Sequence, residues 1–159
     1  VGSEGGSTWG FAATLAAALR AAVQTVHVAP MNGFAPGRHR QVRRFLVLAA
    51  TYGEGAAPAS AKDFLDRLQA LPAAPAAPVA VLGFGDRCYP AFCAFAAAVD
   101  ATARAKGWTT LLPRDTVDRQ SPQDFARWGR SLGQAMGNPP RFSGPRKSPA
   151  SMSMRRYMR

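Results

Sequence analysis

The chain has 159 residues, a formal net charge of +11 and 47% hydrophobic residues. This length fits one domain with a sizeable core, and the hydrophobic content excludes a disordered chain. No apolar run reaches the roughly 18 residues of a membrane span and no signal peptide is visible, which predicts a water-soluble chain. Two cysteines, Cys88 and Cys93, are too few for a disulfide framework or a metal set and favour a reducing, cytoplasmic compartment.

The positive charge is unevenly spread along the chain. Residues 1–138 carry 14 basic and 9 acidic residues, whereas residues 139–159 carry 6 basic residues and no acidic one. The second stretch is also rich in Pro, Ser, Gly and Met, so we expect one domain over 1–138 and a disordered basic tail or linker over 139–159. The chain opens at what reads as the end of a strand, and we interpret it as a fragment that lacks most of its first strand.

The first predicted element is a loop rich in glycine and hydroxyl groups, at residues 2–8, followed by an Ala/Leu-rich helix at 9–23. Backbone N–H groups that converge in such a loop, together with the positive end of a helix dipole, form an anion site. The hydroxyls of Ser3, Ser7 and Thr8 can donate to phosphate oxygens. An ordinary N-capped helix with a flexible start is the simpler alternative.

A short strand is predicted at residues 25–29 from their β-branched content, followed by an irregular stretch at 30–37. Residues 38–44 then hold four arginines and one histidine. They are either a solvated connector or a docking patch for an acidic surface.

An unbroken apolar run at residues 45–50 is typical of a strand buried on both faces of a parallel sheet. It stops in Thr51-Tyr52-Gly53-Glu54-Gly55, where two glycines let the backbone turn tightly and approach a ligand. A helix is predicted at 59–71 from apolar residues spaced three and four apart.

The rest of the chain repeats this alternation. A second buried strand at 79–82 runs into another glycine loop at 83–90, and the spacing of apolar residues then predicts a helix at 89–106, a strand at 109–112, a loop at 113–121 and a helix at 122–136. Alternating strands and helices predict an α/β doubly wound parallel sheet with helices on both faces.

Two of the loops each place a tyrosine, Tyr52 and Tyr89, beside glycines. Aromatic side chains from two loops at one sheet edge can hold a flat ring between them, and such contacts contribute about 0.5–1.5 kcal/mol beyond burial. Taken singly, each tyrosine fits a packing role. With a phosphate loop at the same edge, the pair indicates a mononucleotide site.

Three blocks resemble the flavodoxin-like FMN-binding domain of the diflavin reductases, the group that contains cytochrome P450 reductase and the sulfite reductase flavoprotein. They are residues 2–7, residues 50–55 with Pro58, and residues 82–89 with Phe92-Cys93, and the likeness extends from about residue 1 to 132. The resemblance implies a sheet with the strand order 2-1-3-4-5. Gly5 departs from it, because the family usually has threonine there.

The resemblance also implies roles for single residues. Ser3, Glu4, Gly6, Ser7 and Thr8 are expected to hold the FMN phosphate, Tyr52 and Tyr89 to flank the isoalloxazine ring, Gly53, Glu54 and Gly55 to place backbone near its redox-active edge, and Gly85 and Asp86 to close the third side. No catalytic residue and no metal site is expected. The full expected cofactor set is Ser3, Glu4, Gly5, Gly6, Ser7, Thr8, Thr51, Tyr52, Gly53, Glu54, Gly55, Gly83, Gly85, Asp86, Tyr89, Phe92 and Asp118.

The function implied by the resemblance is electron transfer by FMN, within a fragment of an NADPH-dependent flavoprotein reductase. The expected partners are an FAD/NADPH-binding module of the same parent chain and a haem or metal-centre acceptor, with membrane proximity through the parent protein. An enclosed ring edge without cationic side chains would disfavour the anionic, fully reduced flavin and lower its potential. The alternative is a non-redox flavodoxin-like module that uses its basic patches for nucleic acid or acidic lipid; no aromatic residue is interleaved with those arginines, so nucleic acid is the weaker expectation.

Overall fold

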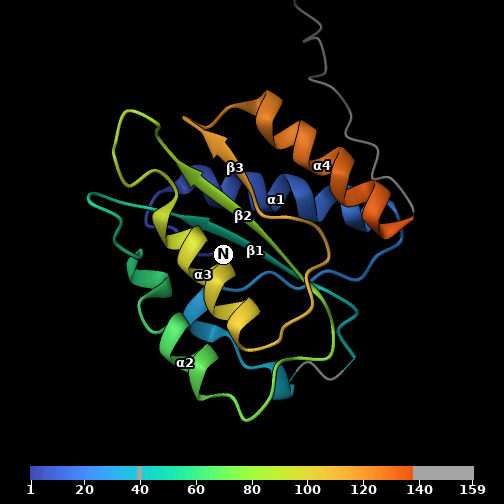
Figure 1. Cartoon of the computed structure of the whole chain (residues 1–159). Helices are drawn as coiled ribbons and strands as arrows, with labels where there is room; N and C mark the ends of the chain where they lie inside the picture. Colours follow the sequence, from blue (N-terminus) through green and yellow to red (C-terminus); the bar gives the residue numbers. More distant parts are fainter. Residues whose placement is uncertain (39–40, 138–159) are drawn as a thin grey trace, which may run out of the picture.

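The computed structural model describes residues 1–38 and 41–137. Its centre is a parallel sheet of three strands, β1 (Phe45–Ala50), β2 (Val79–Gly85) and β3 (Asp115–Asp118), in the order β1-β2-β3 (Figure 1). The register pairs Val47 with Val81 and Phe84 with Val117. All three strands point the same way, so their carboxyl ends meet at one edge of the sheet.

Helices cover both faces of this sheet. The helices α1 (Gly6–Ala21) and α4 (Pro122–Met136) lie on one face, and α2 (Phe64–Ala70) and α3 (Ala94–Ala105) lie on the other (Figure 1). Successive residues of a strand point to opposite faces. Leu48 and Ala50 therefore join the core under α1 and α4, and Val47 and Ala49 join the core under α2 and α3. The predicted doubly wound α/β architecture is confirmed.

The first residues of the chain lie beside β1. Gly2 pairs in parallel with Ala49: its N–H donates to the Leu48 carbonyl and its own carbonyl accepts from Ala50, both at 2.8 Å. On the other side, Val1 donates to the carbonyl of Ala29 at 2.8 Å and accepts from the N–H of Met31 at 2.9 Å. The chain start therefore lies between residues 29–31 and β1, as the first strand lies between the second and third in the order 2-1-3-4-5.

Two predicted strands do not form. Residues 25–29 form no strand: the carbonyl of Ala29 accepts from Val1, and the next residue, Pro30, has no N–H to donate. The segment at 109–112 makes a single bridge, between Thr110 and Val79, after which Pro113 ends the pairing.

The third strand lies instead at Asp115–Asp118, inside the predicted loop 113–121. Only Val117 of its four residues is buried, and β3 is an edge strand of the sheet formed by the described residues. A half-polar edge strand of this kind lacks the apolar run by which the other two strands are recognised.

Helix boundaries also shift. The predicted helix 9–23 begins earlier, at Gly6, and ends at Ala21. The predicted helix 59–71 divides into a 3-10 turn at Ala59–Ala61 and α2, and short 3-10 turns also occur at Met31–Gly33 and Pro36–Arg38. The predicted helix 89–106 begins only at Ala94, because Cys93 adopts a left-handed conformation with φ of 52°. Residues 89–93 therefore belong to a loop.

The helix at 122–136 is confirmed at both ends. The Ser121 hydroxyl accepts from the N–H of Asp124 at 3.2 Å, and Gly137 ends the helix with φ of 70°. No helix within residues 1–38 and 41–137 is long and apolar enough to cross a membrane. The predicted tail at 139–159 lies outside the described residues, so its disorder stays a prediction.

Candidate ligand-binding site at the carboxyl ends of the strands

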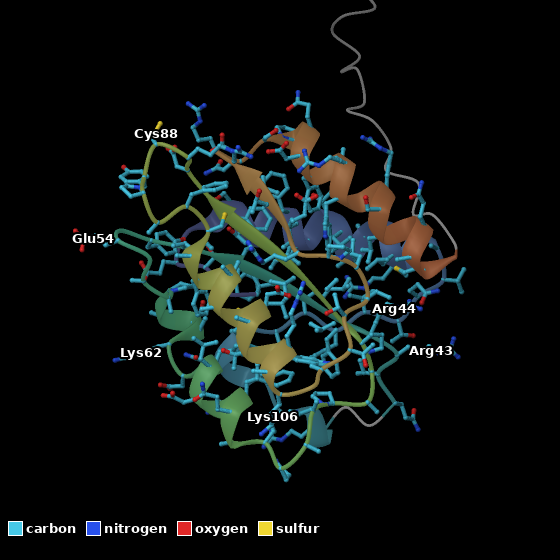
Figure 2. The ribbon with its side chains drawn as sticks, viewed as in Figure 1. Arg43, Arg44, Glu54, Lys62, Cys88 and Lys106 are labelled. Atoms are coloured by element: carbon cyan, nitrogen blue, oxygen red, sulfur yellow. The ribbon has the colours of Figure 1, made fainter. Side chains whose placement is uncertain are left out.

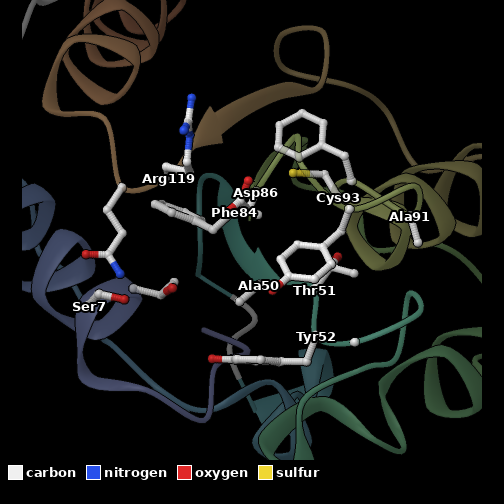
Figure 3. A pocket seen from close by; sticks show the side chains of 15 residues that line it. Ser7, Ala50, Thr51, Tyr52, Phe84, Asp86, Ala91, Cys93 and Arg119 are labelled. Atoms are coloured by element: carbon white, nitrogen blue, oxygen red, sulfur yellow. The ribbon is translucent and has the colours of Figure 1, made fainter.

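A cavity of about 520 Å³ opens where the strands end. This volume falls within the roughly 300–1,000 Å³ of small-molecule pockets. Its walls come from the start of α1, from the loops after β1 and β2, and from the turn after β3 (Figure 3). The lining residues are Ser7, Thr8, Ala50, Thr51, Tyr52, Gly53, Phe84, Gly85, Asp86, Tyr89, Ala91, Phe92, Cys93, Arg119 and Gln120.

The start of α1 has the properties of an anion site. Ser7 and Thr8 line the cavity in the first turn of this helix, where N–H groups lack intrahelical partners and the dipole is positive. Thr8 is only 3% exposed, yet its hydroxyl makes no hydrogen bond to any residue in the described part of the chain. The hydroxyl oxygen itself is not among the fully buried atoms that lack a partner, so it stays accessible from the cavity. Thr8 therefore presents an unused donor to whatever fills the cavity.

The loop before α1 is held by bonds from two other segments. The Tyr52 hydroxyl accepts from the N–H groups of Glu4 and Gly5 at 3.0 and 3.1 Å. The Glu4 carboxylate turns away from the cavity and accepts from the N–H of Ala59 at 3.1 Å. The negative side chain of this loop therefore binds the start of a 3-10 turn and does not line the anion site.

Both predicted tyrosines line the cavity, from separate loops. The Tyr52 ring forms one wall, with its hydroxyl on the side of Ser7 (Figure 3). Tyr89 is 60% exposed, so much of its ring surface is open to solvent at the cavity. Phe92 adds a third ring, over which the Arg87 guanidinium lies 5.2 Å from the centroid. Flat aromatic surface and an anion site thus share one cavity.

Several predicted site residues do not line the cavity. Gly83 is buried against α3, where an added Cβ would lie 2.8 Å from the Cβ of Ala96. Asp118 accepts from the N–H of Arg87 at 2.9 Å and so fixes one loop to another. The predicted residues outside the lining are Ser3, Glu4, Gly5, Gly6, Glu54, Gly55, Gly83 and Asp118.

Thr51 lines the cavity but also has a structural bond, since its hydroxyl accepts from the N–H of Phe95 near the start of α3 at 3.0 Å. Gly53 and Gly55 have φ of 52° and 107°, in the left-handed region that glycine adopts readily. The tight turn expected after β1 is therefore present.

The turn after β3 contributes residues that the sequence did not indicate. Arg119 and Gln120 line the cavity with φ of 45° and 58°, two successive left-handed residues that are not glycine. Such backbone costs on the order of 1–3 kcal/mol per residue. Arg119 adds a cationic side chain to the lining of this cavity. A ring edge without cationic side chains stays a prediction. The other lining residues that were not predicted are Ala50, Phe84, Ala91 and Cys93.

The two cysteines differ in environment. Cys93 is 1% exposed, and burial raises the pKa of its thiol to about 11. Cys88 is exposed, and a hydrogen bond from its thiol to the Asp86 carboxylate raises its pKa. The N–H of Cys88 donates to the same carboxylate at 2.8 Å, which lowers the pKa of Asp86. Neither thiol has the lowered pKa of a nucleophile.

The basic connector lies away from the cavity. Glu54 and Cys88 lie at the end of the molecule where the strands finish, and Arg43, Arg44 and Lys106 lie at the opposite end (Figure 2). Arg44 donates to the Gln24 side chain at 3.2 Å. His39 and Arg40 lie outside the described residues. The docking patch predicted at 38–44 stays a prediction.

Comparison with known proteins places this geometry in a family. A family model described as flavodoxin matches residues 1–128. Over 129 residues, 80% of this chain, the sequence is 28% identical to the sulfite reductase (NADPH) flavoprotein alpha-component of Bacillus subtilis (strain 168) and 33% identical to the protein of the same name from Shewanella sp. (strain ANA-3). These stretches cover 21% of each relative, so the chain spans about a fifth of their length.

The fold has solved counterparts. Oxidised flavodoxin 1 from Bacillus cereus superposes with a TM-score of 0.71 at 20% identity, over 85% of this chain and 92% of that one. The protein is a flavin-carrying α/β domain by fold and family, and this chain belongs to the flavodoxin family. The predicted resemblance is confirmed, and with it the fold class, FMN as the family's cofactor and electron transfer as the role of the domain. The comparisons give no support to the non-redox alternative.

Proposed function

We propose that the cavity at the strand ends holds FMN, with the phosphate at the start of α1 and the ring between Tyr52 and Tyr89. The observation that carries this placement is Thr8: a hydroxyl on a residue only 3% exposed, without a protein partner, that lines the same cavity as the two tyrosines. A phosphate oxygen supplies the missing partner. The neighbouring N–H groups and the Ser7 hydroxyl complete the anion site.

FMN, when bound, supplies the transfer of single electrons. The chain's own residues bind and orient it. Tyr52 and Tyr89 would flank the ring. Glycine at position 85 makes room for Cys93, because an added Cβ there would lie 3.1 Å from the Cys93 sulfur. Arg119, 65% exposed in its side chain, places a positive charge at the rim. The same guanidinium pairs with the Asp118 carboxylate at 3.7 Å, so its charge at the rim is partly compensated.

The partners follow from the relatives as proposals. The two sulfite reductase relatives are named as NADPH flavoproteins and are about five times longer than the stretch matched here. We propose that an FAD/NADPH-binding module of the same parent chain delivers electrons to this domain, and that a haem or metal centre accepts them. A cytoplasmic location suits the two free cysteines. Exposed Tyr89 marks the side of the cavity from which a partner can approach.

The experiment that tests the placement compares two isosteric variants in one helix. Thr8→Val removes the hydroxyl that lines the cavity, and Thr14→Val removes an exposed hydroxyl that bonds only the carbonyl of Gly10 at 3.1 Å. In a fluorescence titration, Thr8→Val weakens FMN binding by about tenfold, the effect of one lost hydrogen bond to a charged group. Thr14→Val binds as the native chain does. Equal affinities for Thr8→Val and the native chain contradict the placement of the phosphate.

A further inference from the structure

The hydroxyl of Tyr52 is completely engaged by the loop before α1. It accepts from the N–H groups of Glu4 and Gly5, and it lies 3.0 Å from the Ser3 hydroxyl. Ser3 gives its own hydrogen to the carbonyl of Gly5 at 3.0 Å. The hydrogen between Ser3 and Tyr52 therefore comes from Tyr52. A phenol has one hydrogen to donate and lone pairs to accept, and this loop uses all of them.

A second residue holds the same loop from the other side. The N–H of Ser3 donates to the Ser60 hydroxyl at 3.0 Å, and that hydroxyl donates back to the carbonyl of Ser3 at 3.1 Å. Ser60 belongs to the 3-10 turn at Ala59–Ala61, whereas Tyr52 follows β1. Two separate segments thus fix residues 3–5.

These external bonds matter because the loop has little rigidity of its own. Gly5 is the residue before α1, with φ of −94° and ψ of 162°, and no side chain caps the helix there. Glycine loses more conformational freedom on ordering than any other residue. Thr8, three residues further on, faces the cavity, so the shape of residues 3–5 sets the direction in which the start of the helix points.

We infer that Tyr52 and Ser60 are positioning residues for the anion end of the cavity. The Tyr52 ring lines the cavity while its hydroxyl holds the loop that leads to the phosphate site (Figure 3). The Tyr52 side chain therefore couples the two ends of the ligand site. The preference for a phosphorylated over an unphosphorylated flavin then depends on the Tyr52 hydroxyl, although this hydroxyl does not contact the phosphate. This inference rests on the proposed function.

The first test needs no flavin. Amide hydrogen exchange by NMR on the native chain and on Tyr52→Phe compares the N–H groups of Glu4 and Gly5. Loss of the acceptor speeds exchange at these two amides by about fivefold or more, the equivalent of one ordinary hydrogen bond. The N–H of Leu48, inside β1, serves as the reference amide. Unchanged exchange at Glu4 and Gly5 overturns the inference.

The second test measures the ratio of riboflavin to FMN dissociation constants. Tyr52→Phe keeps the ring, so riboflavin binding stays near the native value while FMN binding weakens by about tenfold. Ser60→Ala lowers the same ratio without altering any aromatic surface. Tyr89→Phe is the comparator: the Tyr89 hydroxyl makes no hydrogen bond within the described part of the chain, so the ratio stays native whatever the absolute affinities do.

Two results contradict the inference. If Tyr52→Phe weakens both flavins by the same factor, the hydroxyl acts on the ring and not on the loop. If it strengthens FMN binding, the hydroxyl competes with the phosphate for the N–H groups of Glu4 and Gly5. If the folded native chain binds neither flavin, the proposed function is wrong, and the exchange experiment alone decides whether Tyr52 holds the loop.

Discussion

Replacing Gly83 by alanine tests whether this residue serves packing or ligand binding. The sequence predicts Gly83 in the cofactor site. Gly83 lies in β2 beneath α3, and an added Cβ would lie 2.8 Å from the Cβ of Ala96 and 3.1 Å from that of Cys93. Ala96 belongs to α3 and Cys93 directly precedes this helix, so both Cβ atoms yield only if the backbone moves. Overpacking of this kind costs about 1–3 kcal/mol in the free energy of unfolding.

The matched control is Gly10→Ala, because Gly10 lies within α1 and an added Cβ there meets nothing within 4 Å. Alanine in a helix interior is more stable than glycine by roughly 0.5–1 kcal/mol. Urea unfolding followed by circular dichroism, without flavin, measures both variants. Gly83→Ala lowers the midpoint and Gly10→Ala raises it. A midpoint for Gly83→Ala at or above that of the native chain refutes the packing role.

Two further predictions concern titrating groups. At pH 8 in the folded chain, iodoacetamide modifies Cys88 and leaves Cys93 intact, because burial raises the pKa of Cys93 to about 11. Asp86→Asn speeds the reaction of Cys88, because it removes the carboxylate that raises the pKa of this thiol. Mass spectrometry of peptides measures both rates, and modification of Cys93 as fast as Cys88 contradicts the prediction. Asp124 accepts from the N–H of Asp118 and pairs with Arg127, which lowers its pKa below 3.8. The carboxylate of Asp124 stabilises the fold fully above its unfolded pKa, and this stabilisation is lost as the pH falls through the lower folded pKa. Asp124→Asn therefore has a smaller free energy of unfolding than the native chain at pH 7, and the difference shrinks below about pH 4. An equal difference in the free energy of unfolding at pH 7 and pH 2.5 contradicts the prediction.

The sequence predicted those parts of the fold in which burial leaves an unambiguous pattern. The run at 45–50 and the strand beginning at Val79 are apolar because both faces of the sheet are covered. The strand β3 was not predicted, because a single buried residue, Val117, leaves no apolar pattern in the sequence. The strand at 25–29 was predicted from β-branched residues, yet a strand needs a partner backbone, which local propensity cannot supply.

The site divides in the same way. Glycines and tyrosines beside the strand ends indicated the right loops, because binding loops follow parallel strands. Arg119 and Gln120 were not predicted, since their left-handed backbone is imposed by tertiary contacts, among them the bond from the Arg119 N–H to the Gly85 carbonyl at 2.8 Å. The engagement of the Tyr52 hydroxyl with Glu4 and Gly5 joins residues almost fifty positions apart. No local pattern encodes such a contact.

The most direct measurement is an equilibrium titration of the purified chain with FMN, followed by quenching of flavin fluorescence, with circular dichroism to establish that the chain is folded. The expected result is saturable 1:1 quenching with a perturbed absorption spectrum, as the cavity shared by Thr8, Tyr52 and Tyr89 requires. A folded chain that neither quenches FMN fluorescence nor shifts its spectrum contradicts FMN binding at the strand ends, and with it electron transfer by this domain.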